Sequence, residues 1–209
     1  MNSRKKIRNR GEQALEKSVC SFNIFVLYAL TLIMTLGMVV LIFYFSGENA
    51  DLSSDLSGGI CEKLMDFLNN LFHLGWDEIK VLSIAEFVET PVRKCAHFTE
   101  YALLSICVNL HGLSIMRMKK KDIPFEKTIR EQFLKLRLWV LRSCLFCIAY
   151  SVSDELHQSF VPGRACRFFD VCVDTSGILF GAGLVLFVLW FMGRYKKGKK
   201  EKIRNRFVY

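Results

Sequence analysis

Two stretches of this 209-residue sequence combine side chains that can transfer protons or hold an anion. In the first, VRKCAHFTEYALL (92–104), such side chains recur at helical spacing, at Arg93, His97, Glu100 and Tyr101. At 100° per residue these four lie within about one third of a helix circumference. An imidazole can serve as general base or nucleophile when a carboxylate orients it. The stretch therefore supplies candidate catalytic or ligand-binding groups on one face of a helix.

The second stretch, SDELHQSFVPGR (153–164), closes an apolar run that begins at Leu138. Its ionisable and amide side chains are Asp154, Glu155, His157, Gln158 and Arg164. On a helix Asp154, His157 and Gln158 share a face, and Glu155 stands about a quarter turn away. These groups either end a helix at the water's edge or form a polar site inside the membrane.

Two more carboxylates open the last apolar run. Asp170 and Asp174 form one narrow helical stripe with Gly177 and Gly181, at angles of about 0°, 40°, −20° and 20°. Glycines at that spacing allow a second helix to approach closely. The stripe predicts that both acids lie beside a helix–helix contact.

The elements that position these groups are membrane spans. The chain is 52% hydrophobic, with 18 Phe and three Pro. A helix crosses the bilayer core with roughly 20 apolar residues, and four stretches satisfy this: 22–45, 92–116, 138–161 and 168–192. We therefore predict an all-α integral membrane bundle of four transmembrane helices. The first run is too long for a secretory signal peptide and lacks a small-residue cleavage site, so we expect an uncleaved span.

The last three spans carry their ionisable groups near one end and at similar depth. His97, Asp154 and Asp174 each lie roughly 9–10 Å along their helices from that end. A lone charge at such depth costs a few kcal/mol, so the groups should face one another or a wet cavity. The four cations and five acids at these span ends nearly balance in charge, which also fits ion pairs that hold the helices together. Both possibilities, a functional pocket and structural pairing, stay open.

The net charge of +9 follows the order of the spans. Residues 1–21 hold six Lys or Arg, and residues 116–137 and 193–209 hold eight each. Residues 46–92 hold two Lys against nine Asp or Glu. Basic segments stay on the cytoplasmic side, so we expect both tails and the 116–137 connector in the cytoplasm and residues 46–91 outside. The basic tails are expected to touch anionic lipid rather than nucleic acid.

The segment between the first two spans has its own pattern. Apolar residues recur at helical spacing from Leu56 to Phe72, with charged residues opposite. This predicts an outer amphipathic helix, lying on the leaflet or over the bundle. A helical lid without chemistry is the favoured interpretation. Cys144 and Cys147, one turn apart within a span, are predicted to be packing residues.

In three blocks the sequence resembles the VanZ-like family of bacterial membrane proteins. These are FSGENADLSSDLSGGI (45–60), VRKCAHFTEYALL (92–104) and DELHQSFVPGRACRFFDVCVDTSG (154–177), in the family's order. The resemblance covers about residues 25–190. It implies a small helical protein of the bacterial plasma membrane and cell envelope, in a family whose founding member is associated with teicoplanin resistance. It implies no molecular mechanism.

Three functions are compatible with these features. The first is a non-enzymatic envelope protein that binds an anionic group of a lipid or lipid-linked cell-wall precursor. Its ligand-binding candidates are Arg93, Lys94, His97, Glu100, Tyr101, Asp154, Glu155, Gln158, Arg164, Asp170 and Asp174. The second is an intramembrane hydrolase or transferase, with catalytic candidates His97, Glu100, Asp154 and His157. A transporter ranks last, because no broken helix marks a midplane site. We expect no cofactor, no bound metal and no nucleic-acid partner.

Overall fold

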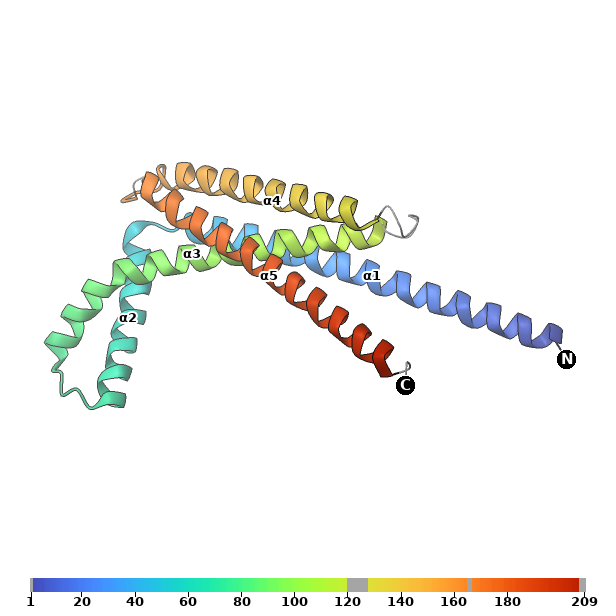
Figure 1. The fold of residues 1–209 in the computed structure, drawn as a ribbon. Coiled ribbons are helices and arrows are strands. Elements are labelled where there is room, and N and C mark those ends of the chain that lie inside the picture. The colour runs from blue at the N-terminus through green and yellow to red at the C-terminus, as the bar shows by residue number, and fades with distance from the viewer. Residues whose placement is uncertain (1, 120–127, 165–166, 207–209) are drawn as a thin grey trace.

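The computed structural model describes residues 2–119, 128–164 and 167–206, and the regular elements there are all helices (Figure 1). They are α1 (Asn2–Ser46), α2 (Ala50–Phe72), α3 (Glu78–Lys119), α4 (Thr128–Gln158) and α5 (Phe168–Arg206). All but α2 contain a stretch long and apolar enough to cross a membrane: Ser21–Ser46, Glu78–Met118, Leu134–Gln158 and Phe168–Tyr195. The predicted all-α membrane bundle with one additional helix is confirmed.

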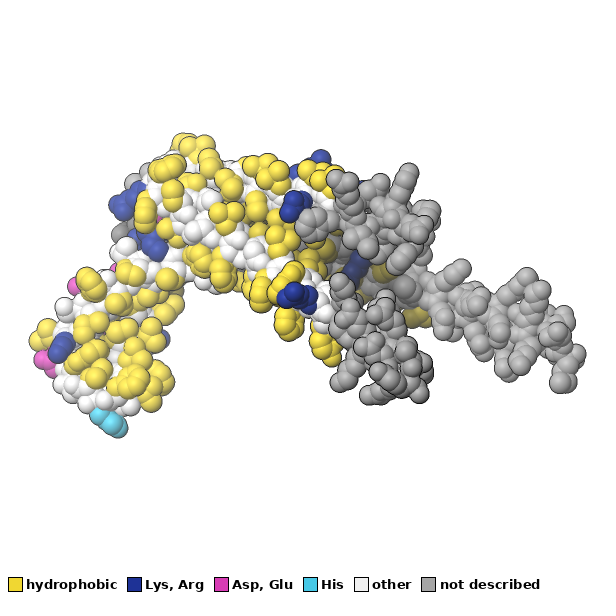
Figure 2. Space-filling model, viewed as in Figure 1, with side chains coloured by type: hydrophobic (Ala, Val, Ile, Leu, Met, Phe, Trp, Pro, Cys, Tyr) yellow, Lys and Arg dark blue, Asp and Glu magenta, His cyan; other side chains and the backbone are white. Residues whose placement is uncertain are grey.

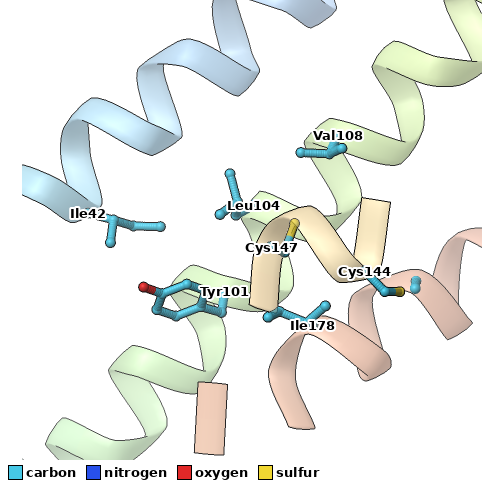
Figure 3. Close-up of a cluster of buried hydrophobic side chains, with 8 residues drawn as sticks. Ile42, Tyr101, Leu104, Val108, Cys144, Cys147 and Ile178 are labelled. Carbon is cyan, nitrogen blue, oxygen red and sulfur yellow. The ribbon is translucent and has the colours of Figure 1, made fainter. Parts of the chain in front are cut away.

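Helix α3 is the centre of the bundle and packs against each of the other four helices. The main core forms where α1, α4 and α5 meet it (Figure 3). Tyr101 and Leu104 from α3 lie there with Cys147 of α4 and Ile178 of α5, all fully buried. Cys144 and Cys147 are free thiols in this core, so their predicted role in packing is confirmed.

The spans alternate in direction. Helices α1 and α4 end, and α5 begins, at the end of the bundle from which α2 and the first turns of α3 project (Figure 1). We call this the hairpin end. Helix α1 begins and α5 finishes at the opposite end. The helix ends that border the three basic segments therefore lie together, away from the acidic segment.

Helix α3 begins earlier than the sequence suggests. The predicted second span starts at Val92, after Pro91, yet α3 starts at Glu78 and contains Pro91. The Asp77 carboxylate caps its first turn by accepting a 3.0 Å hydrogen bond from the amide of Lys80. A proline inside a helix removes one backbone hydrogen bond and bends the helix, and Figure 1 shows α3 changing direction in its first half. At 1.5 Å per residue α3 is about twice the thickness of a bilayer core, so only its later part crosses.

Helix α4 ends sooner than predicted, at Gln158 instead of Val161. Pro162 disfavours helical geometry in the residue before it, and Gly163 adopts a positive φ of 77° that suits glycine. Asp154 thus lies four residues from the helix end, roughly 6 Å along the axis, nearer the end of the span than the predicted 10 Å. In the predicted connector 116–137, residues 120–127 lie outside the described part of the chain.

Candidate functional site

Glycines bring α5 into backbone contact with α3. A Cβ at Gly177 would overlap the carbonyl of Phe98, and a Cβ at Gly181 would overlap the carbonyl of Ala102. Only a residue without a side chain allows this approach. The glycine stripe predicted from the sequence therefore sets how closely the acids of α5 lie to the polar face of α3.

Three buried carboxylates at the hairpin end are held by short contacts. Asp174 of α5 accepts a 2.7 Å hydrogen bond from the hydroxyl of Ser151 in α4. Asp154 accepts one of 3.1 Å from the side-chain amide of Gln158. Glu155 accepts a 3.2 Å bond from the backbone amide of Arg167. These acids are only 2–4% exposed, and burying a charge costs much free energy unless it is paired.

Helix α3 contributes the Lys94 ammonium group, the His97 imidazole and the Tyr101 phenol. Lys94 forms an ion pair with Asp170 of α5. The Nδ1 atom of His97 lies 3.7 Å from a carboxylate oxygen of Glu100. The Tyr101 hydroxyl faces Asp154 but falls short of hydrogen-bond geometry. The chemical types needed for proton transfer and for anion binding are thus present on one helix.

Electrostatic interactions tie the three helices together. Asp154 of α4 interacts with both His97 and Glu100 of α3. Asp174 of α5 interacts with Asp154, Glu155 and Glu100. We call this set the polar cluster, with the following members: Arg93, Lys94, His97, Glu100, Tyr101, Ser151, Asp154, Glu155, Gln158, Arg164, Asp170 and Asp174. Every residue predicted as ligand-binding lies in or at the rim of this cluster, while that role itself stays a prediction.

Arg164 holds the loop after α4 against the end of α1. Its guanidinium donates to the carbonyl oxygens of Phe45 and Ser46, each at 3.4 Å. Carbonyl groups at a helix C-terminus carry partial negative charge, which favours a cation there. Burial lowers the pKa of this guanidinium, and the neighbouring Arg93 lowers it further. In this structure Arg164, predicted to bind a ligand, therefore contacts two carbonyl groups of the protein's own backbone.

His157 is directed away from the other catalytic candidates. Its ring stacks on Phe43 of α1, with centroids 4.7 Å apart. Its Nδ1 atom is buried and has no hydrogen-bond partner among the described residues. The structure thus brings His97, Glu100 and Asp154 together but places His157 in the contact between α1 and α4.

Sequence reasoning missed Ser151 and the α1 contacts. Ser151 stands one turn before Asp154 on the same helix face, a signal that could have identified it. Nothing in the sequence indicates that the carbonyls of Phe45 and Ser46 receive Arg164. No three His, Cys, Asp or Glu side chains within the described ranges are placed to hold a metal ion.

These features define a multi-pass helical membrane protein with an ionisable cluster at one end of its spans. The family model VanZ/LLP1 matches residues 25–190, a range that includes the second and third spans, most of the first and last, and the whole cluster. The chain therefore belongs to the VanZ/LLP1 family, and the predicted resemblance is confirmed. No curated protein and no solved structure matches it.

Proposed function

We propose that this protein resides in the bacterial plasma membrane with both termini in the cytoplasm, and that its polar cluster binds the anionic head of a lipid or lipid-linked cell-wall precursor. Family membership supports the bacterial setting. The charge pattern supports the orientation, because basic segments are retained on the cytoplasmic side. The hairpin end then faces outward.

One observation carries the ligand class. Arg93 is half-buried, and no acid among the described residues forms an ion pair with it. It interacts electrostatically with two further cations, Lys94 and Arg164. Like charges in a region shielded from water repel one another strongly, so a phosphate or carboxylate placed among them would be stabilised by charge-assisted hydrogen bonds.

The buried acids select what accompanies that anion. One carboxylate oxygen of Asp154 and one of Asp174 are buried without a hydrogen-bond partner in the described residues. Such atoms require a donor, which the hydroxyl or ammonium groups of a lipid or sugar head can supply. A ligand that combines an anion with hydroxyl donors therefore fits both the cations and the buried acids of the cluster.

Native mass spectrometry of the protein in mild detergent tests this function. The wild-type chain should retain a phosphate-bearing lipid that Arg93→Gln loses. Lys63→Gln removes the same charge from the exposed face of α2 and is the matched control. Absence of any bound lipid from the wild type, or equal retention by both variants, would contradict the proposal.

A role in resistance to teicoplanin-type glycopeptides follows if the bound head is a wall precursor, because occupancy would reduce access of the antibiotic to its target. A host that expresses the chain should tolerate more teicoplanin than one that expresses Arg93→Gln at equal membrane levels. Equal teicoplanin tolerance of the two hosts would show that lipid binding does not confer resistance.

An intramembrane hydrolase or transferase is the second candidate. It is favoured by the pair His97–Glu100, whose facing atoms lie 3.7 Å apart and in reach of Asp154. A carboxylate so placed can orient an imidazole as general base. Release of a cleaved head group from a lipid-linked substrate by wild type, but not by His97→Gln, would establish this activity.

A further inference from the structure

Helix α2 and the first turns of α3 (residues 50–91) form a helical hairpin with a core of its own. Cys61 and Met65 of α2 pack against Val81 and Ala85 of α3. The hydroxyl of Ser57 also donates a 2.8 Å hydrogen bond to Glu89 across the pair. This core is separate from the one inside the spans, so the hairpin is a distinct packed unit.

The turn of the hairpin is fixed by an asparagine. The Asn69 amide donates to the carbonyl of Trp76, and its oxygen accepts from the Trp76 backbone amide, both at 3.0 Å. His73 and Gly75 between them adopt positive φ values of 52° and 69°. The two hydrogen bonds of the Asn69 side chain hold this turn, in which the positive φ is costly for His73 but not for Gly75. The hairpin is therefore closed at its tip by contacts of its own.

Helix α2 presents three different faces. At 100° per residue, the residues that pack on α3 occupy one side, and the charged residues Glu62, Lys63 and Asp66 occupy another. Between them runs an apolar stripe whose members are 42–61% exposed: Leu56, Ile60, Leu64, Phe67 and Leu71. A stripe that is neither packed nor polar is typical of a helix that lies in the membrane interface.

The direction of the hairpin agrees with that position. Figure 1 shows α2 running across the direction of the spans at their end. If the spans cross the bilayer, α2 lies along its surface. In Figure 2 hydrophobic side chains cover much of the visible face of the hairpin and reach its side toward the spans, while most of the charged ones in view lie at its left edge, away from the spans. A helix in this orientation buries its apolar face among lipid and leaves its polar face in water.

Two features favour lipid over a second copy of the chain as the occupant of the stripe. The hairpin is joined to a membrane span at both ends, so its apolar stripe continues the exposed apolar surface of those spans. Residues 46–91 also carry nine acids and two lysines. Pairing two such hairpins would bring like charges together, which is destabilising.

We propose that the α2–α3 hairpin is an interfacial membrane anchor, with the stripe from Leu56 to Leu71 inserted at the boundary between lipid head groups and acyl chains. Inserted in this way it fixes the depth of the hairpin end, and with it the level of the polar cluster, relative to the bilayer surface. This inference is independent of what the cluster binds.

Depth-dependent quenching of a single tryptophan tests the anchor in the full chain. The background carries Trp76→Phe, Trp139→Phe and Trp190→Phe. Into it Ile60→Trp places the probe on the stripe, and Glu62→Trp, two residues away, places it on the charged face. Both proteins are reconstituted in phosphatidylcholine vesicles, either plain or brominated near the carbonyl end of the acyl chains. Far-ultraviolet circular dichroism in detergent checks that both variants keep the helical content of the parent.

The residue 60 probe should emit at shorter wavelength and be quenched by brominated lipid at least about twofold more than the residue 62 probe. Aqueous iodide should quench only the residue 62 probe. Equal iodide quenching of both would show a stripe exposed to water and overturn the proposal. A blue-shifted residue 60 probe that neither quencher reaches would show a protein-covered stripe, and would overturn it equally.

Discussion

Gly177 of α5 lies directly against the backbone carbonyl of Phe98 in α3, so closely that no Cβ can be accommodated. The obstacle is backbone, which cannot move aside as a side chain can. The contact therefore fixes the spacing of two helices whose next turns toward the hairpin end carry Asp174 and Lys94. Packing of small residues and placement of ionisable groups are linked in this protein.

Gly177→Ala should destabilise the bundle. Overpacking of a tight contact costs about 1–3 kcal/mol, which outweighs the helix propensity of about 0.5–1 kcal/mol that alanine adds. Gly183→Ala is the matched control, since a Cβ there meets nothing within 4 Å. Thermal unfolding in detergent should show a lower midpoint for the first variant and an equal or higher one for the second. Equal midpoints would show that α3 and α5 are not in this contact.

Ser151→Ala should also weaken the protein, for an electrostatic reason. The hydroxyl donates the 2.7 Å bond to Asp174, and loss of a donor to a buried acceptor costs about 1–3 kcal/mol. Ser153→Ala changes an exposed serine on the same helix and should leave the unfolding midpoint unchanged. Asp174→Asn in the Ser151→Ala background should recover part of the loss, because the buried charge is removed. A Ser151→Ala protein as stable as the wild type would argue against the bond.

The spacing of the polar residues predicted much of this cluster, and the reasons for its success are geometric. On a helix, periodicity determines which residues share a face, so the α3 set and the α5 stripe followed from the sequence. The prediction that the polar groups lie near the same end of their spans followed from the lengths of the apolar runs. Both arguments use only the regular geometry of single helices.

Contacts between helices and loops were beyond such arguments. His157 lies within a sixth of a turn of Asp154, and periodicity alone could not decide whether it faced α3 or Phe43 of α1. Arg164 follows a turn that contains Pro162 and Gly163, where no repeat constrains the direction of a side chain. The apolar run predicts a second span that starts at Val92, after Pro91, whereas the Asp77 cap determines the actual start of α3.

The ion pair between Lys94 and Asp170 should couple α3 to α5. Both side chains are about one fifth exposed (21% and 20%), so solvent screens the pair less than it would at the surface. Lys94→Gln and Asp170→Asn should each lower the unfolding midpoint. The double variant should be more stable than the sum of both losses predicts, by about 0.5–3 kcal/mol. Strict additivity would indicate that the two residues do not interact in the membrane.

Arg164→Gln should release the loop after α4 from the end of α1. Two charge-assisted hydrogen bonds to the carbonyls of Phe45 and Ser46 are lost, at a cost of roughly 1–3 kcal/mol. Arg164→Lys should rescue little, because an ammonium group lacks the planar fork that reaches both carbonyls. Amide hydrogen exchange at residues 45–49 and 159–164 should rise in both variants, while exchange in the core of α3 stays unchanged. If instead exchange is unaltered and only retention of the bound lipid falls, Arg164 contacts the ligand. Its hydrogen bonds to the end of α1 are then absent in the membrane.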